Sequence, residues 1–529
     1  MSFSKRIRTG ATRLSLKATA IGIAIALSAC GGGGDATPPQ QAQSFAVAKA
    51  QCGTGDKQET GLQGQVPMSA QAGGFKGFNC NLQPVSATPS ARGEGIFGMF
   101  ALMRDKSGRL CGYTSGAFGD SLGMSVVDLT DPTKAVETAV IKTPGVINAG
   151  ESLRVNEPRG LLIASFYNNG PTEVDVNHGF DVYDVATDCR HPQLLASTTN
   201  LRFPTSGLKP RNPATPLPPS DRTLGHEGWF APDGLTYYVG NLPMQMVHAV
   251  DVTDPTRPSV LDTYQHPVSQ GVHGGSISTD GNRGYFVNSP GPAAAMVPQT
   301  GEWRGGYAVV DTSEIQNRRP GGKMKFLSEA VTRDLSVQQQ TIPVTINGNK
   351  YVFVLGEGGG GRVTKPGILQ ACAAGVIPFA TAQMFYMGDE LNPKLINKTM
   401  LEAQDPKNCS KIMPEIDGIP PLFGSVNFVY DVHHCAVDNR ENATTLACGY
   451  FFSGIRVYDI RDPEHIKEIA YFVPPVKTGA IKWCAAPPIL DVKTSSVYSW
   501  CQDTGIVALK FTNGAWPFPE SATPPGKQL

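Results

Sequence analysis

The chain has 529 residues, and its 45 Lys and Arg residues balance its 45 Asp and Glu residues. Only 17% of the residues are charged, whereas Gly contributes 59 residues and Pro 42, a balance typical of many short strands joined by turns. No basic stripe stands out in the sequence, so we expect no nucleic-acid partner.

The first 29 residues have the features of an export signal. Basic residues precede the first acidic one, Asp35, and they are Lys5, Arg6, Arg8, Arg13 and Lys17. An apolar run over 18–27 follows, too short for a membrane-spanning helix of the mature protein. The quartet Leu27-Ser28-Ala29-Cys30 resembles the lipobox of bacterial lipoproteins. The resemblance implies that Cys30 becomes the first residue and carries acyl chains such as palmitate, which hold the protein at a membrane.

The residues after Cys30 indicate where the lipid would anchor the protein. Gly31 rather than Asp follows the cysteine, and in the familiar sorting pattern this favours the outer membrane. We expect 30–77 to form a lipidated tether with an N-terminal extension. The predicted location is the cell envelope, with the periplasmic or surface face left open. Cleavage removes five basic residues, so the remaining chain is mildly acidic.

A repeated pattern predicts the fold. Stretches beginning at Met124, Val247 and Ile455 each contain a β-branched run that ends in Asp, then a second Asp followed by Pro, then another apolar run. Weaker copies lie at 180–184, 307–311, 384–387 and 505–509. Repeats at long and roughly regular spacing are typical of propellers and solenoids.

Hairpins upstream of these copies complete the repeating unit. Asp233-Gly234 and Asp280-Gly281 each separate two apolar runs, and Asp-Gly is a strong hairpin signal because Gly accepts the positive φ of the turn. Two hairpin strands, the strand that ends in Asp and the strand after Asp-Pro make four antiparallel strands. Four-stranded units around an axis are propeller blades, so we predict an all-β, seven-bladed β-propeller.

The last unit lacks a fourth strand of its own. Only a short Pro-rich segment follows Leu509, whereas the run 78–85 precedes the first hairpin. We therefore predict that an N-terminal strand closes the ring by pairing into the last blade, which removes an exposed sheet edge. The predicted organisation is a signal peptide over 1–29, the tether over 30–77, the propeller over 78–516 and a tail over 517–529.

Three irregular insertions interrupt the repeat at 204–221, 356–382 and 405–426. We predict that they are loops, where binding functions tend to concentrate. The Gly-rich start of the second insertion, 356–362, lacks the Gly-Lys-Ser/Thr ending of a phosphate loop and is predicted to be a flexible loop over a channel mouth.

The strongest copies resemble the LVIVD-repeat family of bacterial exported β-propellers. The resemblance rests on Val126-Val127-Asp128-Leu129-Thr130-Asp131-Pro132 and on the equivalent stretches 249–255 and 457–463. It covers about 93–510 and implies a propeller in an exported lipoprotein. It implies no particular activity, because one fold hosts many functions.

The cysteines predict disulfides. The chain has 11 cysteines. Without Cys30 their number is even, which in an exported chain indicates that they pair as disulfides. Cys435 and Cys448 flank a polar turn, as do Cys484 and Cys501, and cross-strand neighbours are close enough to bridge. The other candidate pairs are Cys52–Cys80, Cys372–Cys409 and Cys111–Cys189. Sequence alone leaves the connectivity open, and no pair has the CxxC spacing of a zinc knuckle.

Histidines at the starts of blades are the candidate metal ligands. His226 and His273 stand at the same distance before the Asp of their hairpin turns, and His433 and His434 fall near the same place in a later blade. Because the first strand of a blade is innermost, we predict that the four side chains converge at one mouth of the central channel. Imidazoles gathered in an oxidising compartment suit copper or zinc. The alternative is that each histidine only hydrogen-bonds neighbouring backbone.

Glu151 and Glu227 lie near these histidines in the pattern and are candidate carboxylate ligands or bases. Lactone hydrolysis at a central divalent ion would need more acidic and amide oxygens at the axis than these two residues supply.

The sequence therefore predicts a non-catalytic, outer-membrane-tethered module that presents its loop face to an envelope protein or a small ligand. The alternative is a copper- or zinc-dependent oxidoreductase or hydrolase that uses the four histidines at the channel mouth.

Overall fold

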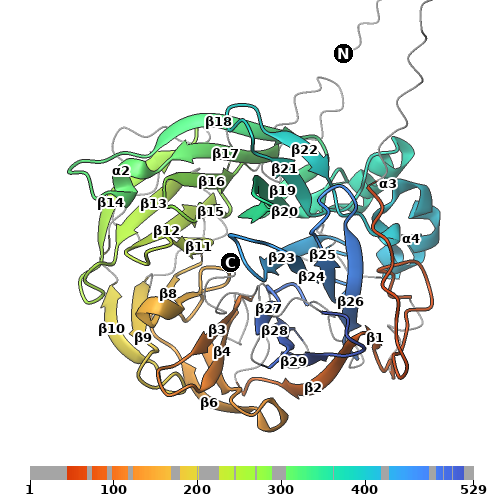
Figure 1. The fold of residues 1–529 in the computed structure, drawn as a ribbon, viewed down its shortest axis with the longest axis horizontal. Coiled ribbons are helices and arrows are strands. Elements are labelled where there is room, and N and C mark those ends of the chain that lie inside the picture. The colour runs from red at the N-terminus through yellow and green to blue at the C-terminus, as the bar shows by residue number, and fades with distance from the viewer. Residues whose placement is uncertain are drawn as a thin grey trace, which may run out of the picture. The chain divides into compact units, whose positions relative to one another are not determined.

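The computed structural model describes residues 45–67, 74–91, 98–116, 123–167, 179–198, 201, 225–242, 246–267, 271–288, 305–361, 363–418, 428–475, 484–491, 494–502 and 504–516. They belong to one compact unit, Phe45–Leu529. Seven antiparallel sheets form a ring (Figure 1), which confirms the seven-bladed propeller. In the part of the chain that is described, no helix is long and apolar enough to cross a membrane. The predicted signal peptide, Cys30 and the C-terminal tail lie outside the described residues.

The first four blades follow one another in chain order. They are β3–β6 (Phe100–Arg104, Leu110–Ser115, Met124–Asp128, Val136–Ile141), β7–β10 (Arg154–Asn156, Leu161–Ser165, Phe180–Asp184, Gln193–Thr198), β11–β14 (Gly228–Phe230, Thr236–Asn241, Met246–Asp251, Ser259–Gln265) and β15–β18 (Gly275–Ile277, Arg283–Val287, Gly305–Asp311, Lys325–Thr332). In each blade the strand order in the sheet equals the order in the sequence.

The last three blades use strands from both ends of the chain. They are β19–β22 (Leu335–Ile346, Asn349–Gly359, Gln383–Tyr386, Lys394–Asn397), β23–β26 (Val432–Val437, Thr445–Tyr450, Ile455–Asp459, Lys467–Val473) with β1 (Phe78–Cys80), and β27–β29 (Ile489–Asp491, Ser496–Cys501, Gly505–Phe511) with β2 (Leu82–Thr88). Figure 1 shows β11, β15, β19 and β23 close to the centre of the ring.

The repeated aspartates build the outer turns of the blades. Oδ1 of Asp128 accepts a hydrogen bond from the amide of Thr130 at 2.9 Å, and Oδ1 of Asp131 accepts one from the amide of Thr133 at 3.0 Å. Asp251 makes the same contact with Thr253 at 2.9 Å. Each outer strand pair also contains a register shift, and bulges of this kind increase strand twist. The repeat therefore shapes blade edges, which confirms its structural role.

The N-terminal segment closes the ring, as predicted. β2 pairs with β29 from Leu82↔Phe511 to Thr88↔Ile506 and supplies the fourth strand of the last blade. The segment does more than the sequence indicated, since β1 also pairs with β26 as a fifth strand of the preceding blade. One short stretch of chain thus joins two neighbouring blades.

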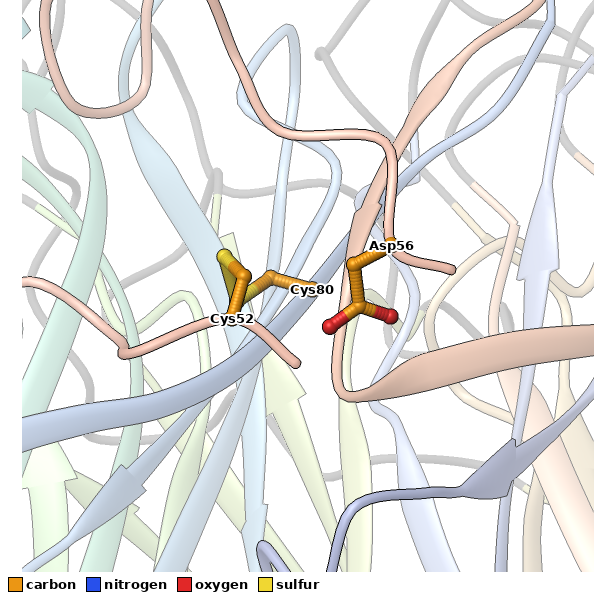
Figure 2. A group of neighbouring side chains, drawn as sticks. All are labelled: Cys52, Asp56 and Cys80. Carbon is orange, nitrogen blue, oxygen red and sulfur yellow. A yellow bond between two sulfur atoms is a disulfide. The ribbon is translucent and has the colours of Figure 1, made fainter. Parts of the chain in front are cut away.

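Five disulfides connect the predicted cysteine pairs: Cys52–Cys80, Cys111–Cys189, Cys372–Cys409, Cys435–Cys448 and Cys484–Cys501. Cys435 and Cys448 face each other directly across β23 and β24. Figure 2 shows the Cys52–Cys80 bridge beside Asp56. Asp56 accepts hydrogen bonds from the amides of Gly53 and Asn81 at 2.8 and 2.9 Å, and so fastens the N-terminal segment to the start of the propeller.

The insertion that begins at residue 356 is not the flexible loop we predicted. Its first four residues belong to the buried strand β20, and the chain then forms helix α3 (Lys365–Ala373) before it reaches β21. The glycines are needed for close packing, because a Cβ on Gly359 would lie 2.2 Å from the backbone carbon of Phe379. The third insertion likewise contains helix α4 (Cys409–Gly418), which Cys372–Cys409 joins to α3.

A buried ion-pair cluster holds the N-terminal segment against the sixth blade. The guanidinium of Arg456 contacts Glu468 and Glu59, both at 2.7 Å, and its side chain is fully buried. Gln63 donates to the same Glu468 carboxylate at 2.9 Å. The segment over 45–66 therefore contributes charged partners to the propeller interior.

Replacing Arg456 with Met should strongly destabilise the protein, because it leaves the buried Glu468 carboxylate without its cation. Breaking a buried pair in this way costs about 3–5 kcal/mol. The measurement is the free energy of unfolding in urea with the disulfides intact. Arg461→Met is the control, since Arg461 is half exposed and pairs with Asp459 at the surface; it should cost at most about 1 kcal/mol. Equal effects of the two substitutions would contradict the role of Arg456.

A buried histidine should make stability pH-dependent. His248 on β13 is fully buried, its Nδ1 lies 3.0 Å from the hydroxyl of Thr263, and burial lowers its pKa to about 3. The unfolded chain takes up a proton near pH 6.5 and the folded chain does not, so stability falls as the pH drops below 6.5. Between pH 7 and pH 5, His248→Asn should remove about 2 kcal/mol of this loss. Urea unfolding at both pH values tests it, with exposed His191→Asn as control. An unchanged pH dependence in His248→Asn would refute it.

Candidate metal centre

The four predicted histidines meet around Glu151, where the innermost strands begin. His226 and His273 lie just before the innermost strands β11 and β15, and His433 and His434 belong to the start of β23. Glu151 precedes β7, the innermost strand of the second blade. The structure therefore brings together residues from three blades and places a carboxylate from a fourth blade between them.

Distances from the Glu151 carboxylate define the centre. Its Oε2 atom lies 3.3 Å from Nε2 of His226 and 3.3 Å from Nε2 of His273. Its Oε1 atom lies 3.0 Å from Nε2 of His433 and 3.8 Å from Nε2 of His434. Two ligands bound to one tetrahedral ion at about 2.0 Å would lie about 3.3 Å apart, so these separations fit atoms that share a metal ion.

All five side chains are buried, with His273 the most exposed at 2%. Neither oxygen of Glu151 receives an aligned hydrogen bond from the described residues. A buried carboxylate without hydrogen bonds is costly unless a cation compensates it. Burial opposes ionisation of Glu151, but the four imidazoles hold its pKa well below the ordinary value.

Hydrogen bonds on the far side of the rings orient the imidazoles. Nδ1 of His273 lies 3.0 Å from the carbonyl oxygen of Gln338, and Nδ1 of His433 lies 3.0 Å from that of Ala485. A carbonyl oxygen only accepts, so in the neutral ring Nδ1 carries the proton and Nε2 directs its lone pair toward Glu151. This is the arrangement usual for metal-bound histidines. The predicted alternative, hydrogen bonding to backbone, is thus also present, but on the opposite ring nitrogen.

Three consecutive glutamines on β19 support the site, and the sequence analysis missed them. Oε1 of Gln340 lies 3.3 Å from Nδ1 of His434 and accepts from the amide of Cys435 at 3.3 Å, which fixes the orientation of the Gln340 amide. Nε2 of Gln339 lies 3.3 Å from Nε2 of His434. A run of three buried polar residues at the start of an innermost strand was the available signal.

Glu357 and Arg154 also belong to the centre and were missed. Oε2 of Glu357 lies 3.2 Å from Nε2 of His433. Arg154 binds Glu227 at 2.6 Å and donates to the carbonyl oxygen of Glu151 at 2.9 Å. Glu357 lies in the Gly-rich stretch that was predicted to be a loop, and Arg154 belongs to no motif that the sequence analysis used.

Glu227 lies beside the histidines, as the pattern indicated. Its Oε2 atom packs closely against Gly274. A Cβ atom at position 274 would lie 1.5 Å from this oxygen. Burial raises the pKa of Glu227 to about 8 although Arg154 opposes the shift. The contact with Arg154 positions Glu227, whereas the four imidazoles face Glu151.

The pKa values of the two histidines of β23 are shifted in opposite directions. Burial works against a charged His433, but Glu151 and Glu357 raise its pKa to about 10. Burial, together with the neighbouring His433 charge, lowers the pKa of His434 to about 3. Glu151 and Glu357 therefore favour a proton on His433 rather than on His434, at a position where a metal cation would compete with that proton.

Imidazole nitrogens with carboxylate oxygens are the donors that zinc and copper prefer, so the residues present fit the predicted ions. The axis also carries more acidic and amide oxygens than predicted, namely Glu357 and Gln338 to Gln340. The donors that face one another are nevertheless mainly nitrogen. A third cluster of possible ligands, Cys52, Asp56 and Cys80 (Figure 2), is not a metal site, because both sulfurs form a disulfide.

Comparisons with known proteins find only distant structural similarity. No family model and no curated protein matches the chain, so membership of the LVIVD-repeat family stays a prediction. Hydrazine synthase of Kuenenia stuttgartiensis is similar over 80% of this chain and 98% of its own, at 14% identity and a TM-score of 0.46. A putative 6-phosphogluconolactonase of Bacteroides uniformis matches over 78% and 92%, at 10% identity and 0.45. The periplasmic gluconolactonase of Pseudomonas aeruginosa matches over 71% and 85%, at 11% and 0.42. Similarity this low carries no argument about function.

Proposed function

We propose that the protein is a metal-dependent enzyme of the cell envelope, a propeller that binds copper or zinc at its channel mouth. The observation that carries the proposal is the convergence of four buried imidazoles on one buried carboxylate. Their Nε2 atoms lie within 3.0–3.8 Å of Glu151. The second-layer contacts of His273, His433 and His434 hold these nitrogens toward the centre without any metal.

The identity of the ion would decide the reaction class. Zinc would supply Lewis-acid chemistry suited to hydrolysis, and copper would supply electron transfer suited to oxidation. The residues of the chain have separate tasks. The histidines and Glu151 bind the ion, and the β19 glutamines hold His273 and His434. Arg154 holds Glu227 next to the centre, where its raised pKa suits it to donate a proton.

Metal analysis of protein produced in the periplasm and purified without chelators tests the proposal. The wild-type protein should contain stoichiometric copper or zinc, and His226→Ala with His273→Ala should lower the metal content at least twofold, because each substitution removes a ligand. The matched control replaces His191 and His465, which are both exposed, and should keep the metal. Metal-free wild-type protein that also takes up no added copper or zinc would overturn the proposal.

A metal-independent binding module is the second candidate function. The observation that favours it is the helical insertion, in which α3 and α4 pack with Phe428, Phe451 and Leu62 into an apolar cluster of their own. This layer extends the propeller with an ordered surface suited to an envelope protein or a small ligand. It becomes the better proposal if the protein binds no metal.

The proposed location depends on Cys30. Cys30→Ser should abolish incorporation of a labelled palmitate, because the thiol that carries the lipid is gone. Gly31→Asp is the matched control, which should keep the label but shift the protein from the outer to the inner membrane fraction. Unlabelled wild-type protein in the soluble fraction would refute the lipid tether and leave the metal centre unaffected.

A further inference from the structure

The two oxygens of Glu151 face different histidine pairs. Oε2 contacts His226 and His273, from the third and fourth blades, while Oε1 contacts His433 and His434 from the sixth blade. Within each pair the rings are neighbours, with centroids 4.2 Å apart in the first and 4.3 Å apart in the second. The carboxylate therefore lies between two imidazole pairs.

Each pair makes its own ligand group with Glu151. The ligand atoms of Glu151, His226 and His273 all lie within 4.8 Å of one another, and so do those of Glu151, His433 and His434. The two groups have Glu151 in common and no histidine in common, so two ions bridged by Glu151 would each take one group.

Glu357 adds an oxygen ligand to one of the two groups. It lies on the His433 side, with its Oε2 atom 3.2 Å from Nε2 of His433. Glu227 is paired instead with the guanidinium of Arg154 at 2.6 Å. The two histidine pairs, and the extra carboxylate beside one of them, therefore support a second ion.

We propose that the centre binds two copper or zinc ions bridged by the carboxylate of Glu151. One ion is held by His226 and His273, and the other by His433 and His434 with Glu357 as an additional ligand. This inference rests on the proposed function, since it requires that the channel mouth binds metal. With two histidines and one bridging oxygen, the first ion has three protein ligands, and a three-ligand ion retains an open position for a substrate.

Single-histidine variants distinguish two ions from one. Full-length protein is stripped with a chelator, dialysed and titrated with Zn²⁺, and bound zinc is counted by elemental analysis. Wild type should bind two ions per chain, and His273→Ala and His434→Ala should each bind one, because each variant damages a different half. Glu151→Gln should lower affinity for both ions, with exposed His191→Ala as the matched control. Circular dichroism and the urea midpoint verify that each variant is folded.

Loading with Cu²⁺ provides a second readout. In wild type a carboxylate-bridged pair should show magnetic coupling in the electron paramagnetic resonance spectrum, and both single-histidine variants should show the signal of an isolated ion. One ion per chain in wild type, lost equally in His273→Ala and His434→Ala, would overturn the two-ion inference but keep the proposed metal function. No bound ion in wild type would overturn both.

Discussion

Closure of the ring is the constraint on which the rest of this structure depends. The last blade has three strands from the C-terminal part of the chain, and β2 from the N-terminal part supplies the fourth. Because the sheets then surround one axis, the innermost strands of all blades begin at the same mouth. That arrangement brings Glu151, which precedes the second blade, to the histidines of the third, fourth and sixth blades.

The centre differs physically from the other clusters of charge in the molecule. The repeated aspartates accept hydrogen bonds from nearby amides at exposed turns, so solvent and backbone satisfy them. Arg456 has carboxylate partners in the interior and forms a closed ion-pair cluster. Glu151 receives no aligned hydrogen bond from the described residues, and the groups that face it are imidazoles. In the proposed function, a metal ion would pair with this carboxylate and with the imidazole nitrogens at the same time.

The ligands found from the sequence were those that the repeat exposed. His226 and His273 hold equivalent positions before recognisable hairpins, so the periodicity of the fold predicted that they point toward the axis. Glu357 was missed because its Gly-rich neighbours indicate a loop, whereas close packing against Phe379 makes the same glycines necessary in a strand. Gln338 to Gln340 were missed because they lie inside the 12-residue strand β19, several residues before the hairpin signal at Asn347-Gly348, so the turn did not indicate which of its residues face the centre.

The sequence by itself determined the blade count, the hairpins and the closing N-terminal strand, because these follow from local turn chemistry and from repeated patterns. It indicated candidate cysteine pairs, but the structure decided their connectivity. Tertiary structure alone decided that Glu151 lies between two histidine pairs and that backbone carbonyls and glutamines fix the ring orientations. It also decided that β1 extends the sixth blade. These features depend on atoms from different blades meeting within about 4 Å, and no local pattern in one blade encodes the position of another.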